Sequence, residues 1–210
     1  MRHVTPISSC FGIDRGLPVD RYYIEKFLSL YSNDIRGNVL EIGDNTYTRK
    51  FGRNRVSKSD VLHVKHGNPN ATIVGDLAEN AHDLRTNSFD CLIITQTLQL
   101  IYDLQAALTT IHRILKPGGS VLVTIPCITS LCDEEWREYW CWGFTKVSAK
   151  RLFEDVFSAS NVKVEVYGNV LVAVSFLEGL AAQELEIEEL DYQDPSYPVL
   201  ITVRATKSEV

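Results

Sequence analysis

A chain of 210 residues, 45% of them hydrophobic and 23% charged, has the composition of a single globular domain with a substantial core. Its net charge of −6 excludes a protein that holds nucleic acid through its overall field, because phosphate binding needs a basic face. No apolar run is long enough for a membrane span, and the first residues lack the apolar core of a signal peptide. The five cysteines include no CxxC pair, so we expect free thiols and a cytoplasmic protein.

The first part of the chain alternates helix and strand patterns. Glycines and a proline make residues 1–18 irregular, and apolar spacing predicts a helix over 20–31. The following elements are expected to be a strand at 38–42, a short helix at 46–51, and strands at 60–65 and 71–75. This alternation is typical of a doubly wound α/β sheet.

The second part continues the alternation. Residues 90–95 form a continuous apolar run, which predicts a central parallel strand covered on both faces. A stripe of leucine and isoleucine predicts a helix over 103–115, ended by a turn at Lys116-Pro117-Gly118-Gly119. The remaining expectations are strands at 120–126, 162–167 and 199–204, helices at 148–157 and 169–183, and a solvated acidic connector at 184–194.

The turn after the first predicted strand carries most information about a ligand. The run Val39-Leu40-Glu41-Ile42-Gly43-Asp44 is an apolar strand that ends in glycine, with carboxylates on both sides of the glycine. Ligands of such sheets bind at the carboxyl ends of the strands. No second glycine follows Gly43, and Asp44 would repel a pyrophosphate. The pattern therefore favours a ligand with ammonium, sulfonium and hydroxyl groups.

Four motifs in order, VLEIG, VGDL, FDCLI and LKPGGSVLV, resemble the class I S-adenosylmethionine-dependent methyltransferases, especially the methyltransferase type 11 group. The resemblance is close over residues 36–127 and loose elsewhere. It implies a Rossmann-like, seven-stranded, mostly parallel sheet with helices on both faces and an antiparallel last strand. It also implies one domain over 1–210, divided into an N-terminal cap (1–35), a cofactor-binding half (36–127), an acceptor-side insertion (128–147) and a C-terminal half (148–210).

The same resemblance implies S-adenosyl-L-methionine as cofactor and assigns residues to it. Glu41 anchors the loop or reaches the methionine amine indirectly. Asp76 is expected to accept from the adenine amine; the alternative is that it caps the turn after the strand. The cofactor contacts expected on this basis are Glu41, Gly43, Asp44, Asp76, Leu77, Thr95 and Gln96, with Thr95 and Gln96 at the methionine end.

The chain departs from the family pattern at two places. The family loop usually has two or three glycines, where this chain has one. The family also places a carboxylate at the end of the second strand, to accept both ribose hydroxyls. That position falls within His63-Val64-Lys65-His66, where His63 can accept one ribose hydroxyl and Lys65 can accept none. We expect His63 to contact the cofactor.

The run from Asp14 to Tyr23 is rich in Arg and Tyr, and in many relatives the segment before the first strand folds over the cofactor. Arg15 is expected to meet the methionine carboxylate, and Tyr22 to cover the sulfonium by a cation–π contact. The alternative is that both residues cap the first helix and pack on its outside.

All three tryptophans lie in one segment after the fifth strand, where family members insert their acceptor-binding element. Amphipathic rings suit a sugar or another flat acceptor. We expect this segment to close over the methyl group without contacting adenine; the alternative is a structural lid or a dimer face. The residues assigned to the acceptor are Trp136, Tyr139, Trp140 and Trp142, and Asp133 and Glu134 are candidate general bases.

The sequence therefore predicts a methyltransferase, with an oxygen of a sugar or small metabolite as the methyl acceptor. The alternative is a catalytically silent methyltransferase fold that serves as a binding or scaffold subunit. A dinucleotide oxidoreductase is disfavoured by Asp44 and by the absence of GxGxxG. We expect no metal, no nucleic-acid or membrane partner, and a monomer or homodimer.

Overall fold

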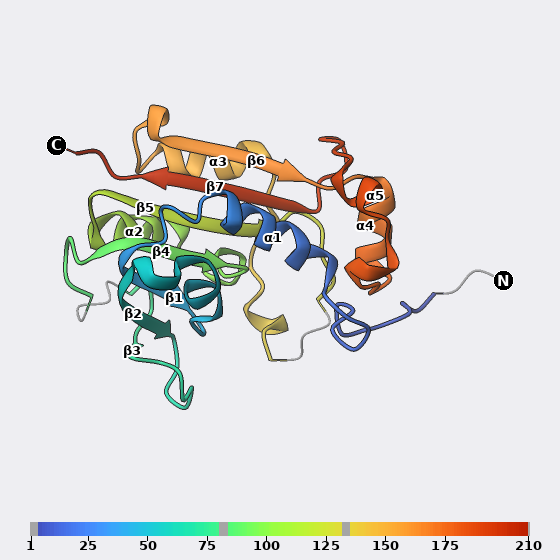
Figure 1. Cartoon of the computed structure of the whole chain (residues 1–210), viewed down its shortest axis with the longest axis horizontal. Coiled ribbons are helices and arrows are strands. Elements are labelled where there is room, and N and C mark those ends of the chain that lie inside the picture. Colours follow the sequence, from blue (N-terminus) through green and yellow to red (C-terminus); the bar gives the residue numbers. More distant parts are fainter. Residues whose placement is uncertain (1–3, 80–83, 132–134, 210) are drawn as a thin grey trace.

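The computed structural model describes residues 4–79, 84–131 and 135–209, whose strands form one sheet (Figure 1). The strand order is β3-β2-β1-β4-β5-β7-β6. The pairs among β1 to β5 are parallel, and β7 runs antiparallel to both β5 and β6. The predicted Rossmann-like sheet is therefore confirmed. The strands are β1 (Gly37–Ile42), β2 (Val56–His63), β3 (Ile73–Val74), β4 (Phe89–Thr95), β5 (Leu115–Pro126), β6 (Val162–Tyr167) and β7 (Leu200–Thr206).

Helices cover both faces of the sheet. Side chains alternate between faces along a strand, so Val39 and Leu40 of β1 belong to two different buried clusters. The cluster with Leu40 includes apolar residues of α2 (Leu104–Ile114) and α3 (Lys146–Glu154). The cluster with Val39 includes apolar residues of α1 (Val19–Leu30) and α4 (Val170–Leu177).

Several predicted boundaries are wrong. β2 begins and ends earlier than expected, so His63 is its last residue and Lys65 lies beyond the strand. The predicted turn at 116–119 belongs to β5, which begins at Leu115, directly after α2. Pairing with the last strand explains this extension, because the Gly118 amide donates to the Lys207 carbonyl just beyond β7 at 2.9 Å.

The C-terminal third differs most from expectation. The helix predicted over 169–183 ends at Leu177, because Gly179 has a φ of +73° and turns the chain. The acidic connector contains a short helix, α5 (Ile187–Asp191). Leu190 of this helix is buried, and its carbonyl accepts the Tyr23 hydroxyl at 2.8 Å. An apolar residue within the acidic run therefore anchors that segment to α1.

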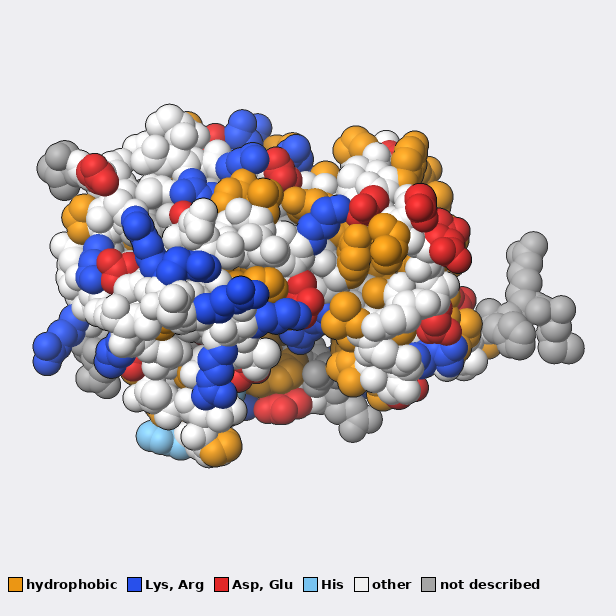
Figure 2. Space-filling view, viewed as in Figure 1, with side chains coloured by type: hydrophobic (Ala, Val, Ile, Leu, Met, Phe, Trp, Pro, Cys, Tyr) orange, Lys and Arg blue, Asp and Glu red, His pale blue; other side chains and the backbone are white. Residues whose placement is uncertain are grey.

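α4 is apolar on all sides. It buries Val172 and Phe176 but leaves Val170 and Val174 more than half exposed. Figure 2 shows hydrophobic side chains gathered beside acidic ones at the end of the molecule that carries α4 and α5. Within the described residues, no helix has the length and apolar character needed to cross a bilayer.

Candidate functional site

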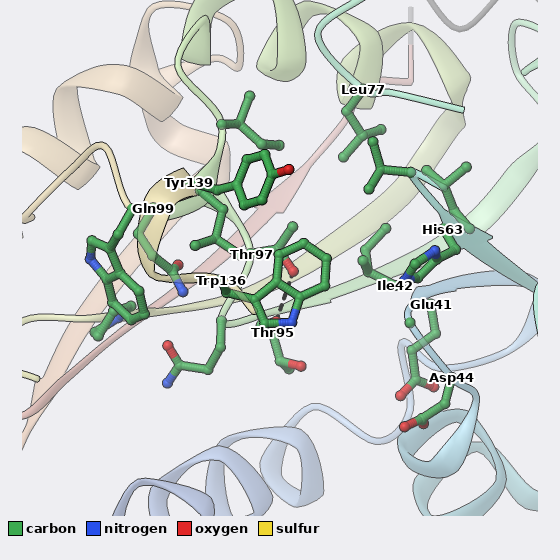
Figure 3. A pocket seen from close by; sticks show the side chains of 18 of the residues that line it. Glu41, Ile42, Asp44, His63, Leu77, Thr95, Thr97, Gln99, Trp136 and Tyr139 are labelled. Carbon is green, nitrogen blue, oxygen red and sulfur yellow. Dashed lines mark hydrogen bonds between the residues drawn. The ribbon is translucent and has the colours of Figure 1, made fainter. Parts of the chain in front are cut away.

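A cavity of about 1150 Å³ opens at the carboxyl edge of β1, β2 and β4. Its walls come from the turn after β1, the end of β2, residues 75–79, the end of β4, the aromatic segment and the N-terminal segment. Figure 3 shows labelled side chains from these strand ends around one hollow, with the rings of Trp136 and Tyr139 among them. The volume slightly exceeds the usual range for a single small ligand, roughly 300–1,000 Å³, so the cavity has room for more than one small molecule.

Glu41 holds the turn after β1 in place. Its carboxylate accepts the backbone amides of Tyr47 at 3.1 Å and Thr48 at 2.7 Å. These amides begin the π-helical turn Thr48–Gly52, whose first amides have no partner within the turn. The side chain is 2% exposed, and this burial raises the pKa of Glu41 to about 7. Glu41 thus anchors the loop, one of the two roles expected for it.

Gly43 and Asp44 follow Glu41 in the chain and line the cavity beside it. Gly43 has a φ of +85°, and no atom lies within 4 Å of the position that a Cβ would occupy. A side chain there would therefore point into open space above the turn. The Asp44 carboxylate is exposed and accepts the Thr46 amide at 2.7 Å. The loop leaves room for a ligand directly above its backbone.

The end of β2 meets the aromatic segment. The Lys65 Nζ lies 4.7 Å from the centre of the Tyr139 ring and 5.7 Å from that of Trp136, and it donates to the Tyr139 hydroxyl at 3.2 Å. The His63 ring lies 6.3 Å from the Trp136 ring in an edge-to-face arrangement. The rings therefore lie beside His63, which the sequence places near the ribose. The expectation that this segment does not contact adenine stays a prediction.

Asp76 and Leu77 follow β3 and line the cavity. One oxygen of Asp76 accepts the Ala78 amide at 2.8 Å, so the carboxylate caps its own turn, as the alternative interpretation expected. Leu77 is 4% exposed and supplies an apolar surface beside it. The adenine contact assigned to these residues stays a prediction.

The end of β4 joins the cavity to α1. Gln96 has a φ of +48°, unusual for a residue other than glycine, and its side-chain amide donates to Asp20 at 3.3 Å. Arg21, the next residue of α1, donates to the Tyr47 hydroxyl at 2.6 Å. Burial raises the pKa of Asp20. Thr95, Gln96, Asp20 and Arg21 all line the cavity.

Asp20, Arg21 and Tyr47 were missed by sequence reasoning. Asp20 and Arg21 belong to the Arg- and Tyr-rich run that drew attention to Arg15 and Tyr22. The available signal was their place at the first turn of the predicted helix, which the α/β topology brings to the carboxyl edge of the sheet.

Arg15 and Tyr22 do not line the cavity, which corrects their expected role. Arg15 forms an ion pair with Glu184, and the Tyr22 hydroxyl donates to Asp191 at 2.7 Å. Both partners come from the acidic C-terminal segment, which lies against the outer side of α1. These residues pack outside the helix, as the alternative interpretation held.

The acceptor-side residues divide in three. Trp136, Tyr139 and Trp140 line the cavity. Trp142 does not line it, because its indole donates to the Ile101 carbonyl at 2.9 Å and its ring stacks on Tyr102. Asp133 and Glu134, the candidate bases, lie outside the described residues.

The charge of the lining indicates what the cavity can hold. Among the described residues that line it, seven are acidic and only two, Arg21 and Lys65, are Lys or Arg. Even without Glu41 and Asp20, whose pKa values are raised by burial, the acidic residues outnumber the two cations, which favours a cationic ligand over a phosphorylated one. No group of three or more His, Cys, Asp or Glu within the described ranges is arranged to hold a metal ion. The acidic residues are Asp20, Glu25, Glu41, Asp44, Asp76, Glu79 and Asp103.

Comparison with known sequences agrees with the motifs. Residues 25–123 match a family model described as a methyltransferase domain. A curated relative, the ubiquinone/menaquinone biosynthesis C-methyltransferase UbiE of Citrobacter koseri, is 33% identical over 88 residues, which cover 41% of this chain and 32% of that protein. The chain thus aligns with about a third of the length of that relative.

Solved structures share the fold. A SAM-dependent methyltransferase from Archaeoglobus fulgidus has a TM-score of 0.60 at 14% identity, covering 89% of this chain and 94% of its own. Phosphoethanolamine N-methyltransferase 2 of Haemonchus contortus, solved with S-adenosyl-L-methionine, has a TM-score of 0.54 at 14% identity, covering 96% of this chain and 60% of its own. The family model over residues 25–123 and the shared fold agree with the resemblance to class I S-adenosylmethionine-dependent methyltransferases.

Proposed function

We propose that this protein, a chain with the class I S-adenosylmethionine-dependent methyltransferase fold and with the methyltransferase domain over residues 25–123, methylates a small acceptor. The observation that carries the proposal is the acidic cavity beside Gly43, at the carboxyl edge of the sheet. The printed names of the relatives include a C-methyltransferase and an N-methyltransferase. These names do not agree on the acceptor atom. We keep an oxygen, which the sequence favours, as the proposed acceptor atom.

The residues present suit S-adenosylmethionine. The sulfonium and ammonium groups are cationic, and seven described lining residues are acidic. The open space above Gly43 lets a ligand approach the backbone without meeting a side chain. Arg21 is the cation on the α1 side of the cavity, and we assign it to the methionine carboxylate in place of Arg15.

The order of strands sets the direction of the ligand. Residues 75–77 and the end of β2 lie toward the β3 side of the sheet, whereas Gln96 and Asp20 meet at the end of β4. We assign the nucleoside to the β2–β3 side and the methionine moiety to the β4 side. Trp136 and Tyr139, held by Lys65, then cover the nucleoside. The sequence instead predicts that these rings contact the acceptor, and this is the competing assignment.

S-adenosylmethionine, when bound, supplies an electrophilic methyl group and leaves S-adenosylhomocysteine. The residues of this chain then bind, orient and exclude water, which is the main contribution to such displacements. Glu41 keeps the β1 turn in one conformation through two backbone amides. The aromatic pair and Leu77 provide apolar cover on the nucleoside side. A dedicated base is not required by this arrangement.

Isothermal calorimetry with S-adenosylhomocysteine tests the proposal. We expect a dissociation constant in the micromolar range, about −7 to −8 kcal/mol. No heat and no thermal shift at millimolar ligand would contradict the proposal and favour the silent scaffold. NADH serves as the control ligand, and tighter binding of NADH would favour an oxidoreductase.

A second measurement separates the two assignments of the aromatic segment. Adenosine and methionine are titrated separately into the wild type and Trp136→Ala. If Trp136 covers the nucleoside, the substitution weakens adenosine and leaves methionine unchanged. Unchanged affinity for both adenosine and methionine would indicate that Trp136 contacts the acceptor instead.

A further inference from the structure

The cavity has an apolar wall that the cofactor assignments leave unused. Phe11, Ile13, Leu17 and Pro18 line it from the N-terminal segment, and Phe176 lines it from α4. The rings of Phe11 and Phe176 stack with centroids 6.3 Å apart. No charged side chain of residues 11–18 lines the cavity, since Asp14 accepts the Ser8 hydroxyl and Arg15 pairs with Glu184.

This wall is held by backbone contacts as well as by side chains. The Ser8 amide donates to the Glu178 carbonyl at 3.0 Å, and the Ala182 amide donates to the Leu17 carbonyl at 2.7 Å. A Cβ on Gly12 would lie 2.6 Å from the Leu180 carbonyl oxygen, and a Cβ on Gly179 would collide with the Ser8 carbonyl oxygen. Two glycines thus let two chain segments, 8–18 and 178–184, approach closely. The wall is a built part of the cavity.

The wall lies on the methionine side of the cavity. Pro18 is followed by Val19 and Asp20, and Asp20 accepts the Gln96 amide at the end of β4. Pro126 and Thr129, at and beyond the end of β5, also line the cavity. In the strand order, β4 and β5 lie on the opposite side of β1 from β2 and β3. An acceptor must sit beside the methionine end, which is where this wall stands.

We propose that the apolar wall of Phe11, Leu17 and Phe176 binds the methyl acceptor, an uncharged compound with a flat or aliphatic apolar body, whose single polar nucleophilic group points toward Asp20 and Gln96. The proposal rests on the proposed methyltransferase function. It replaces the sugar ring with an apolar body, because this wall offers the numerous hydroxyls of a sugar no hydrogen-bond partner among the side chains that form it.

The test uses 2-naphthol, a flat apolar body with one hydroxyl, titrated into protein saturated with S-adenosylhomocysteine. The expected result is binding to the wild type below millimolar concentration, with methyl β-D-glucoside binding at least tenfold more weakly. Phe11→Ala is expected to weaken 2-naphthol about tenfold and to change S-adenosylhomocysteine affinity less than twofold. Asp20→Asn should reduce the preference for 2-naphthol over naphthalene, because the carboxylate faces the hydroxyl.

Trp142→Ala is the matched control, since it also removes an aromatic ring but outside the cavity lining. The proposal is overturned if 2-naphthol does not bind at millimolar concentration, if the glucoside binds equally well, or if Trp136→Ala weakens 2-naphthol more than Phe11→Ala does. Failure of the wild type to bind S-adenosylhomocysteine would instead overturn the methyltransferase function itself.

Discussion

The two ends of the cavity are built in different ways. The polar end consists of turns that directly follow β1, β2, β3 and β4, and it lies within the segment that matches the methyltransferase domain model. The apolar end joins residues 8–18 to residues 178–184, and both segments lie outside that match. The turns of the polar end are thus local and lie in the matched segment, whereas the apolar end joins two segments that are distant in sequence.

The two ends of the cavity are expected to respond differently to substitution. Turns after parallel strands are positioned by the sheet, so their geometry tolerates change elsewhere in the chain. The apolar wall depends instead on two glycines that fit against carbonyl groups of the opposite segment. Substitutions at the two ends should therefore separate cofactor binding from acceptor binding.

The largest effect is expected for Gly179→Ala. A positive φ costs a residue with a Cβ about 1–2 kcal/mol, and the overlap with the Ser8 carbonyl adds to it, for a total of roughly 2–5 kcal/mol of unfolding free energy. Thermal and urea unfolding measure the loss. Gly143→Ala is the control, because its Cβ would meet nothing within 4 Å. If Gly179→Ala melts at the wild-type temperature, the close approach of residues 178–184 to residues 8–18 does not stabilise the protein.

Glu41→Gln tests the polar end. Burial raises the pKa of Glu41 from its ordinary value of 4.5 to about 7 in the folded protein, so the folded state binds the proton more tightly. As pH rises from about 4.5 to 7, this group should lower the stability of the wild type by about 3 kcal/mol relative to Glu41→Gln. Urea unfolding of both proteins at several pH values gives the difference curve. The exposed Glu138→Gln is the control, and a flat difference curve for Glu41→Gln would show that the carboxylate does not titrate in this window.

Arg21→Ala and Arg15→Ala compare two cations of the same N-terminal run. Arg21 lines the cavity, so its removal should weaken S-adenosylhomocysteine by about 1.5–3 kcal/mol if it meets the carboxylate. Adenosine lacks the carboxylate and should bind both variants as it binds the wild type. Arg15 pairs with Glu184 on the surface, so Arg15→Ala should leave both ligands within twofold. Equal losses of S-adenosylhomocysteine affinity in the two variants would indicate that Arg15 also contributes to the site.

The smallest effect is expected at the aromatic cover. Trp136→Ala should weaken S-adenosylhomocysteine by about 1 kcal/mol, since the ring contributes stacking beyond its buried area. Trp142→Ala should leave it unchanged. Calorimetry on both variants is the measurement. A loss in melting temperature that accompanies the loss in affinity would identify Trp136 as a structural lid.

The polar end could be predicted from the sequence because its residues follow strands. Once Gly43, Asp76 and Thr95 are recognised as strand ends, parallel pairing places them at one edge. The same logic placed His63 there, although β2 ends earlier than expected. Arg15 and Tyr22 were misplaced because their partners, Glu184 and Asp191, lie 169 residues away. Residue type does not distinguish Arg15 from Arg21; only the place of Arg21 in the first turn of the predicted helix does.

The apolar wall could not be predicted for the same reason. Gly12 and Gly179 are ordinary turn formers in the sequence, and their mutual fit depends on tertiary approach. The aromatic segment was recognised from the sequence, but the contact of its Tyr139 ring with Lys65 was not expected. A cation in place of the ribose acid indicated a departure from the family. It did not indicate that the cation holds Trp136 and Tyr139.

The bond between Ser8 and Glu178 also bears on how the protein matures during synthesis. At translation rates of 5–20 residues per second, residues 178–184 follow residues 8–18 by roughly ten to thirty seconds. During that interval β1 to β5 are synthesised, while residues 8–18 still lack the segment that they contact in the folded protein. The contacts of Phe11 with Phe176 and of Leu17 with Ala182 can therefore form only after the last third of the chain is made.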